Sequence, residues 1–140
     1  MEYRKCLTNP QSKNLINPTI PLKMHRYKDL KFWQLSRTFC KDIYEITASF
    51  PGEEKFGLVS QLRRATVSIP SNIAEGSARK TDKNFSRFLH ISLGSYYEVE
   101  TQLLLSSDLG LINVKELDTL NNTLLQIIKM MSKFNSSLKI

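Results

Sequence analysis

The chain has 140 residues, 41% of them hydrophobic and 24% charged, which is enough for one globular domain with its own core. No apolar run approaches the roughly 18 residues of a membrane span, and the basic N-terminus lacks the apolar run of a signal peptide. Its two cysteines, Cys6 and Cys40, suit a reducing compartment. We therefore expect a cytoplasmic protein.

The net charge of +7 is distributed unevenly along the chain. Residues 1–30 carry +4 and residues 55–90 carry +5, whereas residues 31–54 and 91–140 each carry −1. Local basic excess of this kind indicates an anionic partner. Residues 1–27 are rich in Asn, Pro, Lys and Thr without an apolar period, which predicts a disordered or loosely packed N-terminal tail ahead of a domain at 28–140.

The first predicted helix runs from about Leu30 to Ser49 and is ended by Pro51 and Gly52. Its apolar residues are spaced three or four apart and form one face: Phe32, Leu35, Phe39, Ile43, Ile46 and Phe50. A second helix follows Glu53, with an inward stripe of Leu58, Leu62, Ala65, Ile69 and Ile73. Pro70 lies within this stripe, so we expect a kink there.

Residues 76–80 predict a turn, and Thr81 or Asp82 is expected to cap a third helix. Its inward face consists of Phe85, Phe88, Leu89, Tyr96, Val99 and Leu103. Gly94 is expected to let a neighbouring helix come close.

The third helix is expected to end in a left-handed cap at Gly110, and Asn113 with Glu116 predicts a capping box. The fourth helix then carries a seam with alternating spacings of three and four: Leu117, Leu120, Leu124, Ile127, Met131, Phe134 and Leu138. Four helices with short connections predict an all-α, antiparallel up-down four-helix bundle.

Further apolar residues lie beside the core stripes of the first and third helices: Trp33, Cys40, Tyr44, Leu93, Tyr97 and Leu104. A bundle helix contacts two neighbours, so a wide buried arc is one interpretation of them. The other is an oligomer interface formed by Trp33, Tyr44, Leu93, Tyr97 and Leu104. Both interpretations remain open from the sequence.

Six basic residues are candidates for nucleic-acid binding: Arg63, Arg64, Arg79, Lys80, Lys83 and Arg87. Lys and Arg grouped near one turn can neutralise phosphates without reading bases. The alternative is a solvated face, or arginines paired with Glu75, Glu98 or a neighbouring subunit. No RNA-recognition motif accompanies the group, so base readout is not supported.

The sequence offers little for catalysis. Ser68, Ser71, Asn72 and Glu75 surround Pro70, where we expect them to bond backbone groups that the proline frees. The isolated His25 and His90 do not have metal-ligand spacing, and Gly-rich phosphate loops are absent. No cofactor, no metal and no enzymatic activity are expected.

One long segment resembles a known signature. Residues 56–76 read FGLVSQLRRATVSIPSNIAEG, followed by FSRFL at 85–89 and LGSYYEVE at 93–100. The segment is similar to the four-helix-bundle family named after proteins encoded in intervening sequences of bacterial 23S ribosomal RNA genes. The resemblance covers roughly residues 26–138 and implies a four-helix bundle.

Members of this family are similar in fold to accessory proteins of diversity-generating retroelements, which form five-membered rings and work with nucleic acid. By that analogy the resemblance implies a homopentamer that contacts RNA or DNA. Our hypothesis from the sequence is therefore a non-enzymatic oligomer that binds nucleic acid through phosphates. The alternative is a structural or protein-interaction scaffold without a nucleic-acid role.

Overall fold

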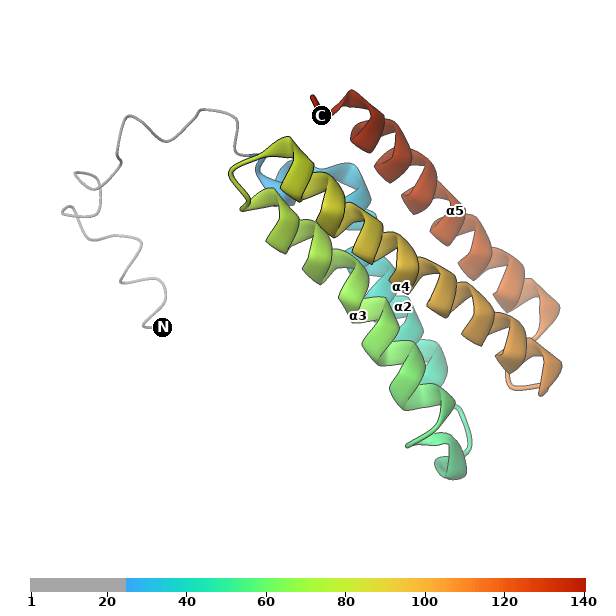
Figure 1. Ribbon diagram of the computed structural model, residues 1–140. Helices are drawn as coiled ribbons and strands as arrows, with labels where there is room; N and C mark the ends of the chain where they lie inside the picture. The colour runs from blue at the N-terminus through green and yellow to red at the C-terminus, as the bar shows by residue number, and fades with distance from the viewer. Residues whose placement is uncertain (1–24) are drawn as a thin grey trace, which may run out of the picture.

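The computed structural model describes residues 25–140 as four long α-helices packed side by side (Figure 1). These are α2 (Lys31–Thr47), α3 (Leu58–Ser77), α4 (Asp82–Asp108) and α5 (Val114–Ser137), with short 3-10 turns η2 (Tyr27–Asp29) and η3 (Gly52–Glu54). Successive helices run antiparallel, and α2 also contacts α5, which closes the bundle. The predicted all-α up-down four-helix bundle is confirmed.

The N-terminal boundary of the bundle lies before residue 28. The imidazole of His25 packs against the rings of Phe85 and Phe134, with centroid distances of 5.6 and 5.0 Å, and Tyr27 packs against Trp33 at 5.0 Å. Packing on the bundle therefore already includes His25. The rest of the predicted tail, residues 1–24, lies outside the described residues.

The helix ends follow the capping signals in the sequence. The side chain of Thr81 accepts a 3.1 Å hydrogen bond from the backbone N–H of Asn84 at the start of α4. Asn113 and Glu116 form the predicted capping box of α5, with reciprocal bonds of 2.8 and 3.0 Å. Gly110 has a φ of +73°, the left-handed conformation that glycine adopts without strain. These three predictions are confirmed.

The core lies between the four helices and consists largely of the predicted apolar stripes, with Val59 and Ile112 added. Phe88, predicted to face inward, is half-buried beneath the Arg79 guanidinium instead. The most deeply buried large side chains of the core come from all four helices: Phe39, Ile43, Leu62, Ile69, Ile73, Val99, Leu103, Leu124 and Ile127. The outer members of the stripes, such as Leu35, Ile46 and Leu58, are half-buried against this core. Periodicity of about 3.6 residues therefore identifies the inward face of each helix.

α3 continues as one helix through Pro70, and the backbone accommodates the proline with help from a neighbour. Proline has no N–H, so the carbonyl of Thr66, four residues earlier, loses its helical donor. The thiol of Cys40 on α2 donates to this carbonyl at 3.4 Å. Asn72 Nδ2 donates to the Ser68 carbonyl at 2.8 Å, so the polar residues around the proline do bond backbone groups. The carbonyl freed by the proline, however, is bonded from α2.

The most extensive helix contact is between α3 and α4, and small residues line it. Ser92 Oγ on α4 donates to the Ile69 carbonyl at 3.0 Å, and the hydroxyls of Ser68 and Ser95 bond to each other at 2.8 Å. At the turn, a β-carbon added to Gly76 would lie 2.6 Å from the β-carbon of Phe88. Only a hydrogen atom fits between the helices there.

The expectation that Gly94 lets a helix come close is wrong. Gly94 is exposed, and a β-carbon added to it would have no neighbouring atom within 4 Å. The side of α4 that meets α3 is formed instead by its buried neighbours Ser92 and Ser95. The close approach is made by Gly76 on α3.

These two glycines give opposite expectations for substitution by alanine. Gly76→Ala places its methyl group against Phe85 and Phe88 and is expected to lower the free energy of unfolding by about 1–3 kcal/mol. Gly94→Ala, the matched control, is expected to raise it by about 0.4–1 kcal/mol, because alanine restricts the unfolded chain and fits an exposed helix position. Urea titration followed by circular dichroism measures both. A neutral Gly76→Ala variant would contradict the close packing of the turn.

The Cys40 thiol gives a pH dependence. Burial raises the pKa of Cys40 from 9.0 to about 11. Between these pH values the unfolded chain loses the thiol proton while the folded chain keeps it, so stability is full below pH 9 and falls towards pH 11. The expected loss is up to about 2 kcal/mol.

Cys40→Ser separates this effect from other alkaline titrations. The serine hydroxyl still donates to the Thr66 carbonyl but does not ionise in this range. The free energy of unfolding of the variant should therefore fall less steeply between pH 9 and pH 11 than that of the parent protein. Equal slopes for the two proteins would rule out Cys40 as the titrating group.

Candidate nucleic-acid interface

Four of the six predicted basic residues gather where α3 turns into α4: Arg79, Lys80, Lys83 and Arg87. All four are exposed. Arg79 is engaged within the chain, since its Nη2 lies 3.1 Å from Glu75 Oε1 and its guanidinium lies 4.6 Å from the centroid of the Phe88 ring. Across residues 25–140, Lys80, Lys83 and Arg87 take part in no ion pair with a carboxylate.

The other two predicted residues, Arg63 and Arg64, lie far from this group. They are about 15 residues before Arg79, which corresponds to roughly 22 Å along α3. Arg63 Nε donates to Thr47 Oγ1 at 3.0 Å and Nη2 donates to the Tyr44 carbonyl at 3.3 Å. The guanidinium of Arg63 therefore donates hydrogen bonds to one side chain and one backbone carbonyl in the last turn of α2. Arg64, in contrast, is exposed on the surface of α3.

Basic residues from both ends of the described chain join the α3–α4 turn. η2 contacts the end of α3, and His25–Lys28 line a common hollow with Ala74, Ser77 and Ala78. The backbone N–H of Lys139 donates to Asp82 Oδ2 at 3.0 Å, which fixes the C-terminus beside the start of α4. In Figure 1 the start of the described chain, the turn and the C-terminus lie at the same end of the bundle.

These terminal residues are not among the six candidates that the sequence indicates. They are separated from the turn by 50 residues or more in sequence, so charge counted by segment does not group them. The signal that identifies them is the topology, because an up-down bundle of four helices places the start of the first helix, the second turn and the end of the last helix together.

Dividing each helix at its midpoint shows how strongly charge is segregated along the bundle. We call residues 25–39, 68–95 and 126–140, which contain the α3–α4 turn, the basic half. It has eleven basic residues: Arg26, Lys28, Lys31, Arg37, Arg79, Lys80, Lys83, Arg87, Lys129, Lys133 and Lys139. Its three acidic residues are Asp29, Glu75 and Asp82, which leaves a net charge of +8.

The remaining described residues, 40–67 and 96–125, form the acidic half. It has five basic residues: Lys41, Lys55, Arg63, Arg64 and Lys115. It has nine acidic residues: Asp42, Glu45, Glu53, Glu54, Glu98, Glu100, Asp108, Glu116 and Asp118. Its net charge is −4, so the two ends of the bundle carry opposite charge.

The carboxylates of the basic half do not neutralise the free lysines there. Asp29 lies 3.6 Å from Arg26 Nε, Glu75 pairs with Arg79, and Asp82 accepts from the Lys139 backbone. Each carboxylate is thus held by one partner. The ammonium groups at this end remain available to an external anion.

The predicted oligomer interface divides between two opposite seams of the bundle. Trp33 and Tyr44 lie on the side of α2 that faces α3, as the Cys40–Thr66 hydrogen bond and the 4.5 Å contact of the Arg63 guanidinium with the Tyr44 ring indicate. Trp33 is half-buried against the core, whereas Tyr44 is 44% exposed although its ring contacts Arg63. Both interpretations of this stripe stay open for α2.

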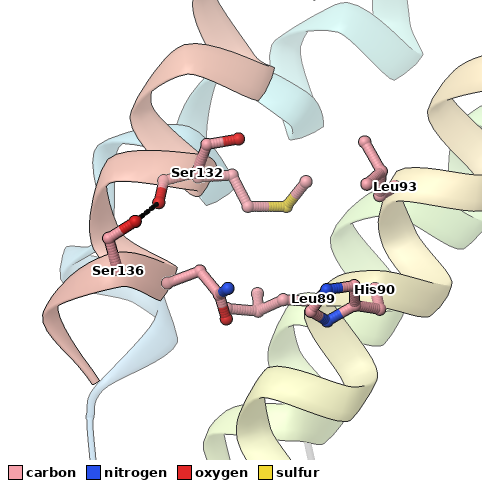
Figure 2. A pocket seen from close by; sticks show the side chains of 7 residues that line it. Leu89, His90, Leu93, Ser132 and Ser136 are labelled. Carbon is pink, nitrogen blue, oxygen red and sulfur yellow. Dashed lines mark hydrogen bonds between the residues drawn. The ribbon is translucent and has the colours of Figure 1, made fainter. Parts of the chain in front are cut away.

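The second stripe lies on α4 beside α5. Leu93 lines a hollow of about 170 Å³ with Leu89 and His90, and the opposite wall is formed by Met131, Ser132, Asn135 and Ser136. Figure 2 shows Leu89, His90 and Leu93 projecting from α4 towards Ser132 and Ser136 of α5. Further along this seam, Tyr97 and Leu104 are 55% and 47% exposed.

Other kinds of site find little support in residues 25–140. No cluster of three or more His, Cys, Asp or Glu side chains in this region is arranged to hold a metal ion. His90 Nδ1 lies 2.8 Å from the Ser86 carbonyl, one helical turn earlier on α4. No helix among the described residues combines the length and hydropathy needed to span a bilayer.

Comparison with known proteins agrees with the fold. A family profile described as 23S rRNA-intervening sequence protein matches residues 28–133. The crystal structure of a protein of unknown function from the S23 ribosomal protein family of Bacteroides thetaiotaomicron aligns with a TM-score of 0.68 at 23% identity, covering 74% of this chain and 96% of that one. No functionally curated protein matches the sequence. These comparisons indicate no enzyme family.

Proposed function

Because the chain belongs to the 23S rRNA-intervening sequence protein family, we propose that it is a non-enzymatic, oligomeric bundle that binds RNA or DNA through phosphate contacts. The observation that carries this proposal is the segregation of charge, with +8 on the half that contains the α3–α4 turn. Within that half, Lys80, Lys83 and Arg87 are exposed and unpaired with carboxylates. Contacts of lysine and arginine with phosphates release counterions, so binding of this kind weakens steeply with salt.

The six residues of the sequence hypothesis contribute unequally to this proposal. Lys80, Lys83 and Arg87 present free charges, and Arg79 lies among them although it also contacts Glu75 and Phe88. Arg63 is engaged with the end of α2. We assign phosphate binding to the four residues at the turn and a packing role to Arg63.

The variant Arg79→Gln/Lys80→Gln/Lys83→Gln is expected to lose at least about tenfold in affinity for RNA at low salt and to show a flatter salt dependence. Fluorescence anisotropy with labelled RNA and DNA at about 50 and 200 mM salt measures both effects. Lys41→Gln/Lys55→Gln/Lys115→Gln is the matched control, because it removes three charges from the acidic half. Absence of binding by the parent protein at the lower salt would favour the scaffold alternative.

The oligomer is the second part of the proposal. On the α4–α5 seam, Tyr97, Leu104 and Leu125 are each about half exposed. Leu125 precedes Ser132 by two helical turns, so it lies on the same side of α5 as the hollow that faces α4. Exposed apolar side chains that form a continuous seam mark association surfaces. The analogy with the ring-forming accessory proteins of diversity-generating retroelements supports five subunits.

Tyr97→Asp is expected to convert the oligomer to a monomer of 16.2 kDa, because it places a charge on the apolar seam. Light scattering after size-exclusion chromatography gives the mass, and circular dichroism checks that the helices remain. Phe56→Asp is the control, since Phe56 is 88% exposed and lies in the connection before α3. An oligomer of unchanged mass in Tyr97→Asp would exclude Tyr97 from the interface.

A further inference from the structure

We propose that the nucleic acid bound by this protein is double-stranded and that it docks across the basic end of the bundle rather than along its side. This inference rests on the proposed function and specifies its ligand. We define the basic end by the exposed cations nearest the α3–α4 turn and the two ends of the described chain that form no ion pair with a carboxylate of residues 25–140: Lys28, Lys80, Lys83, Arg87, Lys133 and Lys139.

The basic half has no exposed Phe, Tyr or Trp side chain, and its one exposed ring is the imidazole of His90, whose Nδ1 lies 2.8 Å from the Ser86 carbonyl. In residues 25–140 the exposed Phe, Tyr and Trp residues are Tyr44, Phe56 and Tyr97, and all three lie in the acidic half. Proteins that bind single strands combine a basic groove with aromatic platforms for the bases. The basic end offers the cations but no exposed Phe, Tyr or Trp, and a single imidazole, His90, does not form a row of platforms for successive bases.

The phenylalanine rings of the basic half are used for packing instead. Phe134 contacts Phe32 and Phe85 with centroid distances of 5.3 and 5.4 Å, and His25 stacks on the same group. Phe88 is covered by the guanidinium of Arg79. A ligand at this end therefore meets ammonium and guanidinium groups rather than phenylalanine ring faces.

A surface that recognises charge alone favours the ligand with the higher charge density. A duplex carries one negative charge for each ~1.7 Å of its axis, whereas each strand carries one for each ~3.4 Å. For the same contact length, a duplex thus offers about twice as many phosphates. Because of this higher phosphate density, we expect the basic end to bind a duplex more tightly than a single strand.

The distribution of acidic residues determines how a bound duplex is oriented relative to the bundle axis. A duplex lying along α4, which is about 40 Å long, passes Glu98, Glu100 and Asp108 in the acidic half. Phosphates and carboxylates repel each other, and the net charge of that half is −4. Across the end of the bundle, two helices side by side span about 20–24 Å, equal to about six to seven base pairs. Docking across the end avoids the acidic half.

The first test is competition between a duplex of about 12 base pairs and each of its separated strands for the parent protein at about 50 mM salt. The duplex is expected to bind at least about tenfold tighter and to lose affinity more steeply as salt is raised. A single strand that binds as tightly as the duplex, or tighter, would overturn this inference while leaving the proposed function intact. If neither ligand binds, the proposed function itself fails.

The second test locates the contact with two variants of equal charge change. Lys28→Gln/Lys133→Gln/Lys139→Gln removes three cations of the basic end, and Lys41→Gln/Lys55→Gln/Lys115→Gln removes three from the acidic half. The first should reduce the slope of log affinity against log salt for the duplex by about 2–3, and the second should leave it unchanged. Equal losses in both variants would show that total charge drives binding, and would overturn docking across the end.

Discussion

The close approach of α3 to α4 at Gly76 is the constraint on which the arrangement of the basic end depends. Because a β-carbon at this position would lie 2.6 Å from the Phe88 β-carbon, the last turn of α3 packs directly on the first turns of α4. The connection between them is consequently short, and Thr81 caps α4 only four residues after α3 ends. This geometry leaves the cations of the turn on the surface, since the space between the helices is filled by Phe85 and Phe88.

Two of the arginines illustrate how one side chain serves packing and charge together. Arg79 covers the face of Phe88 and pairs with Glu75, and Arg63 covers Tyr44 while it bonds the last turn of α2. A guanidinium is weakly hydrated and planar, so it stacks on a ring at little desolvation cost. Lys80 and Lys83 are exposed and lie over no ring of residues 25–140, unlike Lys28, whose ammonium is 6.0 Å from the centroid of the Tyr27 ring. The free cations of the turn are therefore mainly its lysines and Arg87.

Features encoded locally were predicted well from the sequence. The inward stripes follow from spacing along one helix, and the caps at Thr81, Gly110 and Asn113 depend on residues within one turn. Features that depend on a partner helix were not. Gly94 and Gly76 look alike in sequence, but only the position of α4 relative to α3 decides which of them lies at the contact.

The same distinction explains the candidate site. The turn cations were identified because they are neighbours in sequence, and Arg63 was grouped with them although the helix carries it to the other half of the bundle. The hydrogen bond from the Cys40 thiol to the Thr66 carbonyl could not be predicted either. The position of Pro70 shows which carbonyl loses its helical donor, but not which side chain on another helix replaces that donor. Lys133 and Lys139 were missed because charge was counted along the chain rather than along the axis of the bundle.

Segregated charge also gives the described part of the molecule a large electric dipole moment along its long axis. Charges of +8 and −4 have centres separated by about 15–20 Å, as expected for two halves of helices of this length. A polyanion exerts a torque on such a dipole and turns the basic end towards itself during the approach. The search over orientations that slows ordinary association is thereby shortened. Because the Debye length is about 10 Å at 0.1 M salt, this alignment acts over the last stage of the encounter, and association rates become sensitive to ionic strength.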